Sequence, residues 1–382
     1  MSRTGTQTVT AGRQPWRSAA RRIHLWLGLT IGLLFAVISL TGSALVFYVG
    51  IDAVLHPETQ VEHRAPAPGW TSPVWDRALA TGRAARFDPA GKWSFEVTDI
   101  GGAIPARYYP PASGTVRHPP RLMVWFSADG SRILRVAPWG GYLMSWLYEL
   151  HMHLLAGDVG AQVVGWSGVI MLVLLLSGLI AWWPRGSWRK ALAFRRNAPP
   201  IRRLNDIHRL VGVGSGGLLL ILVASGVILA LPAVKAALLS PATVPEPPAI
   251  AGSGPALPIT RALASVRSAV PDARLAFIDV PGDPAVPYRV RIQVPGDPHR
   301  RFPGSYVFVD QRSARIVALH NVRDGGLGTA INAWVRPLHD GSAGGVVGRI
   351  LAVLIGLAPT ALFVTGLLRW RRRRGRSADP AQ

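Results

Sequence analysis

Four long apolar stretches constrain this chain more than any other feature of its sequence. They cover about residues 25–49, 161–183, 209–231 and 346–368, and each can cross a bilayer, which takes about 20 residues in a helix. None of them contains Asp, Glu or Lys. The first stretch runs well past the apolar core of a cleaved signal peptide, so we expect it to remain as an anchor. The sequence therefore predicts four transmembrane helices.

The basic residues gather at the same ends of these stretches. The formal net charge is +22, and residues 1–22, 185–209 and 369–379 hold nineteen basic residues against two acidic ones. Cytoplasmic segments beside transmembrane helices carry such an excess of Lys and Arg. This distribution predicts a membrane protein with both termini and the middle connection in the cytoplasm and two domains on the outer side of the membrane. It also argues against a nucleic-acid partner.

Two outer regions, about residues 50–145 and 232–338, separate the apolar stretches. Each reads as a helix followed by strands, and "PYRVRIQV" shows the alternation typical of a half-buried strand. The segments "VWFSADGSRILRV" and "VFVDQRSARIVAL" look like the same hairpin used twice. The chain has no cysteine, so neither region can rely on a disulfide.

These observations predict nine segments in chain order. They are a cytoplasmic N-terminal segment (1–22), transmembrane helix 1 (23–49), a first periplasmic domain (50–145), transmembrane helix 2 with an outer extension (146–184), a cytoplasmic connection (185–207), transmembrane helix 3 (208–232), a second periplasmic domain (233–335), transmembrane helix 4 with an outer extension (336–369) and a basic cytoplasmic tail (370–382).

The two halves of the chain repeat one another, histidines included. At an offset of 184 residues the first and third stretches match at His24/His208, Gly28/Gly212, Gly32/Gly216 and Gly42/Gly226. At 188 residues the second and fourth match at His151/His339, Gly160/Gly348 and Gly178/Gly366. Both halves enter the membrane in the same direction, so we expect their symmetry axis to lie along the membrane normal. Histidines related by that axis can face each other.

This symmetry makes the four histidines candidate haem ligands. A haem b iron takes an axial imidazole on each face, so His24 and His208 would hold one haem at the cytoplasmic end, and His151 and His339 a second at the outer end. Four glycines lie one and two turns from the cytoplasmic histidines and would leave room for a flat macrocycle. They are Gly28, Gly32, Gly212 and Gly216.

Plainer interpretations of these residues stay open. Glycines every fourth residue are also ordinary helix-packing positions in membranes, and a lone histidine at a membrane boundary is often interfacial. His153 is an alternative to His151, although its aligned position is Gly341. The outer histidines also lie beyond the apolar stretches unless "AGDVG" and "DGSAGG" break the helices. The aromatic residues before the second and fourth stretches form either an interfacial belt or a docking surface; they are Trp139, Tyr142, Trp146 and Trp334.

The apolar stretches and their flanks resemble a known family. The segments "RRIHLWLGLTIGLLFAVISLTGSALVFY" and "LYELHMHLLAGDVGAQVVGWSGVIMLVLLLSGLIAWWPR" are similar to the PepSY-associated transmembrane helix family. Their counterparts in the second half are similar too, and the resemblance covers essentially all of residues 15–375. The fold it implies is an all-α membrane bundle of four transmembrane helices from an internal duplication. Two small α+β PepSY-like periplasmic domains would be attached to that bundle.

The resemblance also implies a function. Members of this family include ferrisiderophore reductases with haem in the four-helix bundle, so we expect a ferric-chelate reductase-type oxidoreductase with two haems b. The sequence shows no G-x-G-x-x-G after a strand, so a separate reductase or a membrane quinol would supply electrons. The partners expected are the lipid bilayer, that donor and a ferric siderophore or other Fe(III) chelate.

Three other classes of function remain alternatives. A haem-free PepSY sensor or scaffold would use the stretches only as anchors. Haem electron transfer could instead serve another periplasmic acceptor. A transporter is disfavoured, because no acidic side chain lies within the apolar stretches to bind a substrate.

Overall fold

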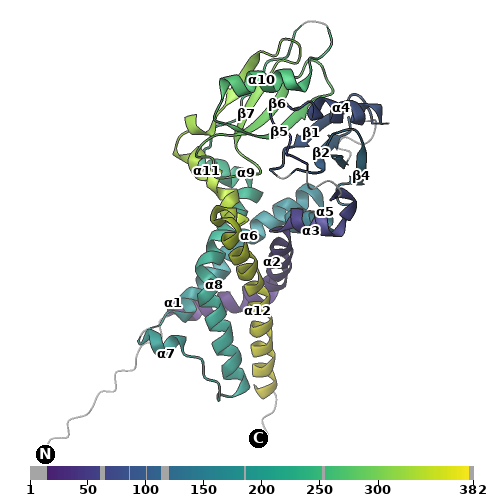
Figure 1. Cartoon of the computed structure of the whole chain (residues 1–382). Coiled ribbons are helices and arrows are strands. Elements are labelled where there is room, and N and C mark those ends of the chain that lie inside the picture. The colour runs from purple at the N-terminus through teal and green to yellow at the C-terminus, as the bar shows by residue number, and fades with distance from the viewer. Residues whose placement is uncertain are drawn as a thin grey trace, which may run out of the picture. The chain divides into compact units, whose positions relative to one another are not determined.

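The computed structural model of the chain describes residues 15–60, 65–85, 87–99, 101–112, 120–184, 186–251 and 254–377 (Figure 1). It divides into two compact units. The first comprises Met1–Leu40, Trp166–Ala224 and Leu354–Gln382, and the second comprises Thr41–Gly165 and Ser225–Val353. Four helices pass from one unit into the other: α2 (Gly32–Leu45), α6 (Gly157–Trp182), α8 (Pro200–Ala230) and α12 (Gly345–Ser377).

The first unit is helical and apolar. Besides parts of those four helices it holds α1 (Pro15–Thr30) and α7 (Trp188–Leu192). Its buried core takes one side chain from each long helix, namely Phe35, Met171, Leu219 and Ala358. Other large apolar side chains of the same helices point outward, including Val173, Ile221 and Leu354. A helix that is apolar all round belongs in a membrane or a large core, so these faces fit contact with lipid.

The expected all-α bundle of four transmembrane helices is wrong in two respects. Helices account for 56% of the chain, and 13% lies in one eight-stranded antiparallel sheet, so the fold is mixed rather than all-α. Among the described residues only Gly157–Trp182, Pro200–Ala230 and Ser342–Arg374 are long and apolar enough to span. The fourth expected span is two helices, Pro15–Thr30 and Gly32–Leu45, bent by 63°.

The bend has a local cause. The Thr30 hydroxyl donates to the carbonyl of Trp26 at 2.8 Å, and Gly32 begins the second helix. Hydroxyl bonds of this kind, to the carbonyl four residues back, bend helices, and glycine weakens them. A Cβ at Gly32 would also lie 2.8 Å from the ring of Phe363, so the bent chain passes close to α12.

The second unit is built on a sheet in the order β4-β3-β2-β1-β5-β6-β7-β8. Its strands are β1 (Lys92–Glu96), β2 (Ile104–Tyr109), β3 (Leu122–Phe126), β4 (Ile133–Pro138), β5 (Arg274–Val280), β6 (Tyr288–Gln293), β7 (Ser305–Val309) and β8 (Ile316–His320). Every neighbouring pair is antiparallel. Strands β3–β4 and β7–β8 are the two hairpins expected from the sequence.

The expectation of two small outer domains is also wrong, because the regions share one sheet. Strand β1 pairs antiparallel with β5, with Trp93 opposite Val280 and Glu96 opposite Phe277. A sheet edge exposes a row of unpaired backbone groups, and pairing the equivalent strand of each half removes both edges at once. The buried core of this sheet accordingly draws side chains from both halves, such as Phe95 and Ile278.

The two faces of the sheet differ sharply in chemistry. Helices α4 (Val74–Ala84) and α10 (Ile259–Ala269) cover one face (Figure 1), and Trp75 and Leu263 are fully buried there. On the other face, successive outward positions of β6 are Arg289, Arg291 and Gln293, since the strand alternates buried and half-buried residues. One face is thus an apolar core, and the other is strongly basic.

Short helices lie on the basic side of the sheet (Figure 1). They are α3 (Tyr48–Leu55), α5 (Leu143–His153), α9 (Pro232–Leu239) and α11 (Leu327–His339), with 3₁₀ turns at Pro57–Thr59, Val322–Asp324 and Ser342–Gly344. Helix α5 ends before Leu154 and Leu155, which adopt φ of 47° and 59°, and α11 ends before Gly341, with φ of 75°. The helices therefore break at both "AGDVG" and "DGSAGG".

Candidate functional site

His24 and His208, the first pair, face each other in the first unit. Their ring centroids lie 6.0 Å apart with an interplanar angle of 79°. The Nδ1 atom of His24 lies 3.0 Å from the carbonyl oxygen of Leu174 on α6. A carbonyl can only accept a hydrogen bond, so His24 carries its proton on Nδ1 and presents the lone pair of Nε2.

The same tautomer follows for His208. Its Nδ1 atom lies 2.9 Å from the Thr365 hydroxyl on α12. That hydroxyl donates its own proton to the carbonyl of Ala361 at 2.7 Å, so it accepts from His208. Both imidazoles of the first pair therefore keep Nε2 as an electron-pair donor, which is the form that ligates a metal.

Glycines allow these rings to lie against a neighbouring helix. A Cβ at Gly178 would stand 2.7 Å from Cε1 of His24, and one at Gly366 would stand 3.5 Å from the same atom of His208. The first distance is shorter than any real Cβ contact, so only glycine fits beside His24. Beside His208 a Cβ is tolerable.

His151 and His339, the second pair, face each other in the second unit. Their ring centroids lie 6.2 Å apart with an interplanar angle of 40°. The Nδ1 atom of His151 lies 3.3 Å from the Thr41 hydroxyl, and that of His339 lies 3.3 Å from the Ser225 hydroxyl. A Cβ at Gly42 would stand 2.8 Å from His151, and one at Gly226 would stand 2.8 Å from His339.

A hydroxyl residue followed by glycine recurs beside all four histidines. The dipeptides are Thr41-Gly42, Ser177-Gly178, Ser225-Gly226 and Thr365-Gly366. In three of them the hydroxyl bonds Nδ1, while Ser177 bonds the carbonyl of Leu174 at 2.9 Å, the carbonyl that His24 also uses. The repeat alignment contained these glycines, and the dipeptide is the signal that would have linked them to the histidines.

The four glycines predicted to pack a haem lie elsewhere. A Cβ at Gly28 would come no closer than 3.9 Å to Leu174, and one at Gly212 would lie 3.5 Å from Leu362. Gly32 lies against Phe363, and a Cβ at Gly216 would meet nothing within 4 Å. None of these positions contacts a histidine ring, so their role in binding a cofactor stays a prediction.

The structure also separates the two outer candidates, His151 and His153. The ring of His151 lies opposite that of His339, whereas Nδ1 of His153 lies 2.7 Å from a carboxylate oxygen of Glu149.

The four aromatic residues before the second and fourth apolar stretches fall into two groups. The indole of Trp139 donates to the other carboxylate oxygen of Glu149 at 2.5 Å. The hydroxyls of Tyr48 and Tyr142 lie 2.5 Å apart. Trp139 and Tyr142 are thus held within the second unit, while Trp146 and Trp334 remain exposed.

One basic side chain lies near the first pair. Arg369 follows Thr365 by one turn of α12 and acts electrostatically on both His24 and His208. Its Nε atom is buried and has no hydrogen-bond partner among the residues that the structure describes. A cation in this position is suited to a carboxylate on a bound group.

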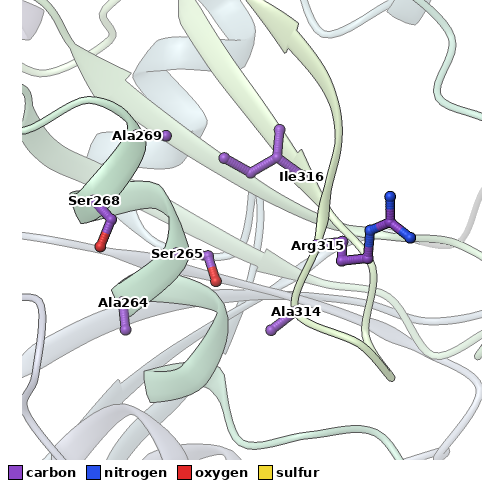
Figure 2. A pocket seen from close by; sticks show the side chains of 7 residues that line it. All are labelled: Ala264, Ser265, Ser268, Ala269, Ala314, Arg315 and Ile316. Carbon is purple, nitrogen blue, oxygen red and sulfur yellow. The ribbon is translucent and has the colours of Figure 1, made fainter.

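A shallow depression of about 640 Å³ lies apart from both pairs, between α10 and the β7–β8 hairpin. Figure 2 shows small side chains of α10, such as Ser265 and Ser268, on one side and Ala314, Arg315 and Ile316 on the other. Among the described residues that line it, Arg315 alone is charged, and none of the others is titratable. We therefore place the candidate site at the histidine pairs.

Fold and site together define a multi-pass membrane protein with a duplicated architecture and two histidine pairs that bridge helices. The sequence model of the PepSY-associated TM region matches residues 21–373, nearly the whole chain. The chain belongs to this family, as the resemblance indicated. No curated protein matches the sequence significantly.

Proposed function

We propose that this protein is a haem b electron-transfer protein of the bacterial inner membrane that delivers electrons to a periplasmic Fe(III) chelate. It would be a ferric-chelate reductase with two haems per chain. The observation that carries the proposal is the geometry of the two pairs. In each, two imidazoles from different helices face each other, with Nδ1 of both rings bonded to a neighbouring helix.

The spacing of the pairs fits an iron between them. Metal–imidazole bonds of about 2 Å on each side, plus the radius of each ring, separate the centroids of two opposed ligands by roughly 6 Å. The measured separations are 6.0 and 6.2 Å. A haem held by two imidazoles supplies one-electron transfer through its iron.

The surrounding residues would hold and orient the ligands. Bonds from Nδ1 to a carbonyl or hydroxyl fix the tautomer and the ring plane and raise the basicity of Nε2. The glycines beside the rings let each imidazole approach the next helix closely. At the first pair, Arg369 would neutralise a carboxylate of the macrocycle, which satisfies its buried Nε atom.

The helix breaks support a membrane location for the second pair. His151 contacts Thr41 and Gly42, and His339 contacts Ser225 and Gly226. These contact residues lie inside the apolar stretches 25–49 and 209–231. The breaks therefore bring both histidines back to the level of apolar segments, as efficient transfer across a membrane requires.

Delivery of an electron to the chelate would release its iron. Hard oxygen ligands match the higher charge of Fe(III) and hold Fe(II) far less well. The electron would come from a membrane quinol or a separate cytoplasmic reductase. The basic segments at residues 1–22, 185–209 and 369–379 support cytoplasmic termini and a periplasmic sheet.

The decisive experiment is a reduced-minus-oxidised visible spectrum of the purified full-length protein, with haem quantified per chain. We expect about two low-spin haems b, in line with the two pairs. Reduced protein mixed with an Fe(III) chelate should reoxidise as the Fe(II) product appears. A purified wild type without absorbance in the Soret region would overturn the proposal and favour the haem-free scaffold.

The proposed orientation has its own test. Reporter fusions after residue 195 and at the C-terminus should indicate the cytoplasm, and fusions near residues 90 and 290 should indicate the periplasm. A periplasmic signal at residue 195 would contradict both the orientation and the direction of electron flow.

A further inference from the structure

The basic face of the sheet gathers four arginines around one phenyl ring. The guanidinium carbons of Arg301, Arg336, Arg107 and Arg291 lie 5.1, 5.2, 5.8 and 5.8 Å from the ring centroid of Phe302. They come from the β6–β7 loop, helix α11, β2 and β6. We call Phe302 and these four residues the arginine cluster.

In the part of the chain that the structure describes, only two of the four arginines in the cluster form an ion pair with a carboxylate. Glu96 pairs with Arg107 at 2.9 Å and with Arg301 at 2.6 Å. Burial alone would raise the pKa of Glu96, but the charges of Arg301 and Arg107 lower it overall. This carboxylate is therefore ionised and fully committed to two of the four arginines.

The other two arginines form no ion pair among the described residues. Arg291 donates to the carbonyl of Pro303 at 2.6 Å, and Arg336 contacts the Phe302 ring. The next carboxylate, Asp279, is taken by Lys92 at 3.3 Å and Arg289 at 2.5 Å. Two guanidinium groups are thus brought together without a carboxylate of their own in contact.

Such an arrangement is costly unless an anion completes it. Burial lowers the pKa of Arg291, and the charges of Arg289 and Arg336 act in the same direction, while Tyr306 and Asp279 oppose them only in part. The side chains of Arg291 and Arg336 are both half-buried. Like charges that are partly withdrawn from water repel each other, and a charge without a partner there destabilises a fold. The repulsion would be relieved by an anionic group placed between Arg291 and Arg336.

Flat aromatic side chains line the same place. Arg291 lies 5.8 Å from the Phe277 ring and 4.9 Å from the Tyr306 ring, and the rings of Phe277 and Phe302 are stacked at 5.6 Å. Guanidinium planes and aromatic faces both stack on planar rings. Arg336 also lies one turn before His339 on α11, so the cluster adjoins the second histidine pair.

We propose that the arginine cluster binds the iron chelate, and that it selects anionic chelates whose iron-binding groups are planar aromatic rings, such as catecholates. This inference rests on the proposed function and names its substrate class. Arg291 and Arg336 would pair with phenolate oxygens. The partly exposed rings of Phe302 and Tyr306 would contact the rings of the chelate, and buried Phe277 would support Phe302 from below.

Binding of two chelates of opposite character to the oxidised full-length protein tests this selectivity. The first is a tripodal tris-catecholate ferric chelate, which is trianionic at neutral pH; the second is a tripodal tris-hydroxamate ferric chelate, which is neutral. Equilibrium dialysis with radiolabelled iron gives both dissociation constants. We expect Arg291→Gln or Arg336→Gln to weaken binding of the catecholate about tenfold each, and the double variant about a hundredfold. Binding of the neutral chelate should hardly change.

Arg315→Gln is the matched control, because Arg315 lies in the loop between β7 and β8 of the same unit but borders the shallow depression instead (Figure 2). It should leave both dissociation constants unchanged. An equal loss of affinity for the catecholate in this control would overturn the proposal. Equal affinity of the wild type for both chelates would also overturn it. So would a double variant that keeps its chelate affinity but loses a preference for nanodiscs containing anionic lipid, since the cluster would then serve lipid headgroups.

The visible spectrum separates this inference from the proposed function. Each variant should keep the haem content of the wild type, because neither arginine lies in a histidine pair. Full haem content without catecholate selectivity would leave electron transfer standing and refute the docking site. Selective binding of the catecholate by a protein that contains no haem would refute the proposed electron transfer and leave the docking site standing.

Discussion

The two histidine pairs have nearly equal ring separations but are held in different ways. In the second pair both rings bond hydroxyls at 3.3 Å, and a Cβ added at the neighbouring glycine would stand 2.8 Å from either ring. In the first pair, His24 bonds a backbone carbonyl and His208 a hydroxyl. The neighbouring glycines also differ. A Cβ at Gly178 would be too close to His24, whereas a Cβ at Gly366 would fit beside His208. The second pair keeps the symmetry of the duplication, and the first has lost it.

Their positions along the helices differ as well. His24 and His208 lie inside α1 and α8, so the regular helix sets where their rings point. His151 and His339 lie near the ends of α5 and α11, directly before the helix breaks. The turns after these residues, rather than helix geometry alone, place the second pair. The comparison shows that one duplicated architecture can set the same spacing between two histidine rings in two different ways.

We expect the largest effect from a double variant that breaks both histidine pairs at once. His24→Ala combined with His151→Ala should abolish nearly all haem binding, because each haem would lose one of its two axial ligands. His24→Ala with His208→Ala should keep about one haem, since the second pair is intact. Haem quantified per purified chain measures both, and His153→Ala, which should keep two, is the control. A full haem in the first double variant would refute the pairing.

The next effect tests the loss of symmetry in the first pair. Gly178→Ala should displace His24 and remove about one haem per chain, whereas Gly366→Ala should leave the haem content unchanged. In the second pair, Gly42→Ala and Gly226→Ala should each remove the other haem, because both Cβ atoms would stand 2.8 Å from an imidazole. Similar results for Gly178→Ala and Gly366→Ala would show that the first pair is symmetric after all.

A smaller effect concerns the hydroxyl partners. Thr365→Val should weaken haem binding at the first pair about tenfold, because Nδ1 of His208 loses its acceptor. Ser225→Ala should do the same at the second pair. Haem titration of the apoprotein gives these affinities, and Thr365→Ser, which keeps the hydroxyl, should restore binding. Unchanged affinity in Thr365→Val would mean that this bond does not orient the ring.

The smallest expected effect distinguishes the pairs by charge. Arg369→Gln should lower the midpoint potential of one haem by roughly 60 mV, the equivalent of a tenfold change in a one-electron equilibrium. The sign follows because reduction adds an electron, which a nearby positive charge stabilises. Spectroelectrochemical titration resolves the two haems, and only the one assigned to the first pair by His151→Ala should shift. An equal shift in both would place Arg369 outside the first site.

The repeat and the basic flanks were enough to pair the histidines from the sequence. The glycines predicted to lie beside a haem, however, are not the ones that contact the histidine rings. Gly28 and Gly212 share a helix with His24 and His208, and the spacing of four residues drew attention to them. The imidazoles instead lie against Gly178 and Gly366 on adjacent helices. Which helix receives a side chain depends on how the helices pack, and periodicity within one helix carries no information about that.

The sheet was likewise predictable only where its features depend on local sequence. The two hairpins were recognisable from "VWFSADGSRILRV" and "VFVDQRSARIVAL", because alternation is a local property. The pairing of β1 with β5 joins Phe95 to Ile278 across about half of the chain. Either strand taken alone would be predicted to lie at the edge of a sheet. The bend at Gly32 was equally hidden, since hydropathy measures whether a segment is apolar and not whether it is straight.

The β1–β5 junction has a consequence for assembly. These strands are equivalent in the two halves and pair antiparallel, as identical surfaces do across a two-fold axis. Each half supplies one member of each histidine pair: His24 and His151 come from the first, His208 and His339 from the second. The chain is therefore organised as a homodimer whose subunits are covalently linked. A polypeptide ending in the 185–207 connection should dimerise through β1, with His24 and His151 each facing its own copy.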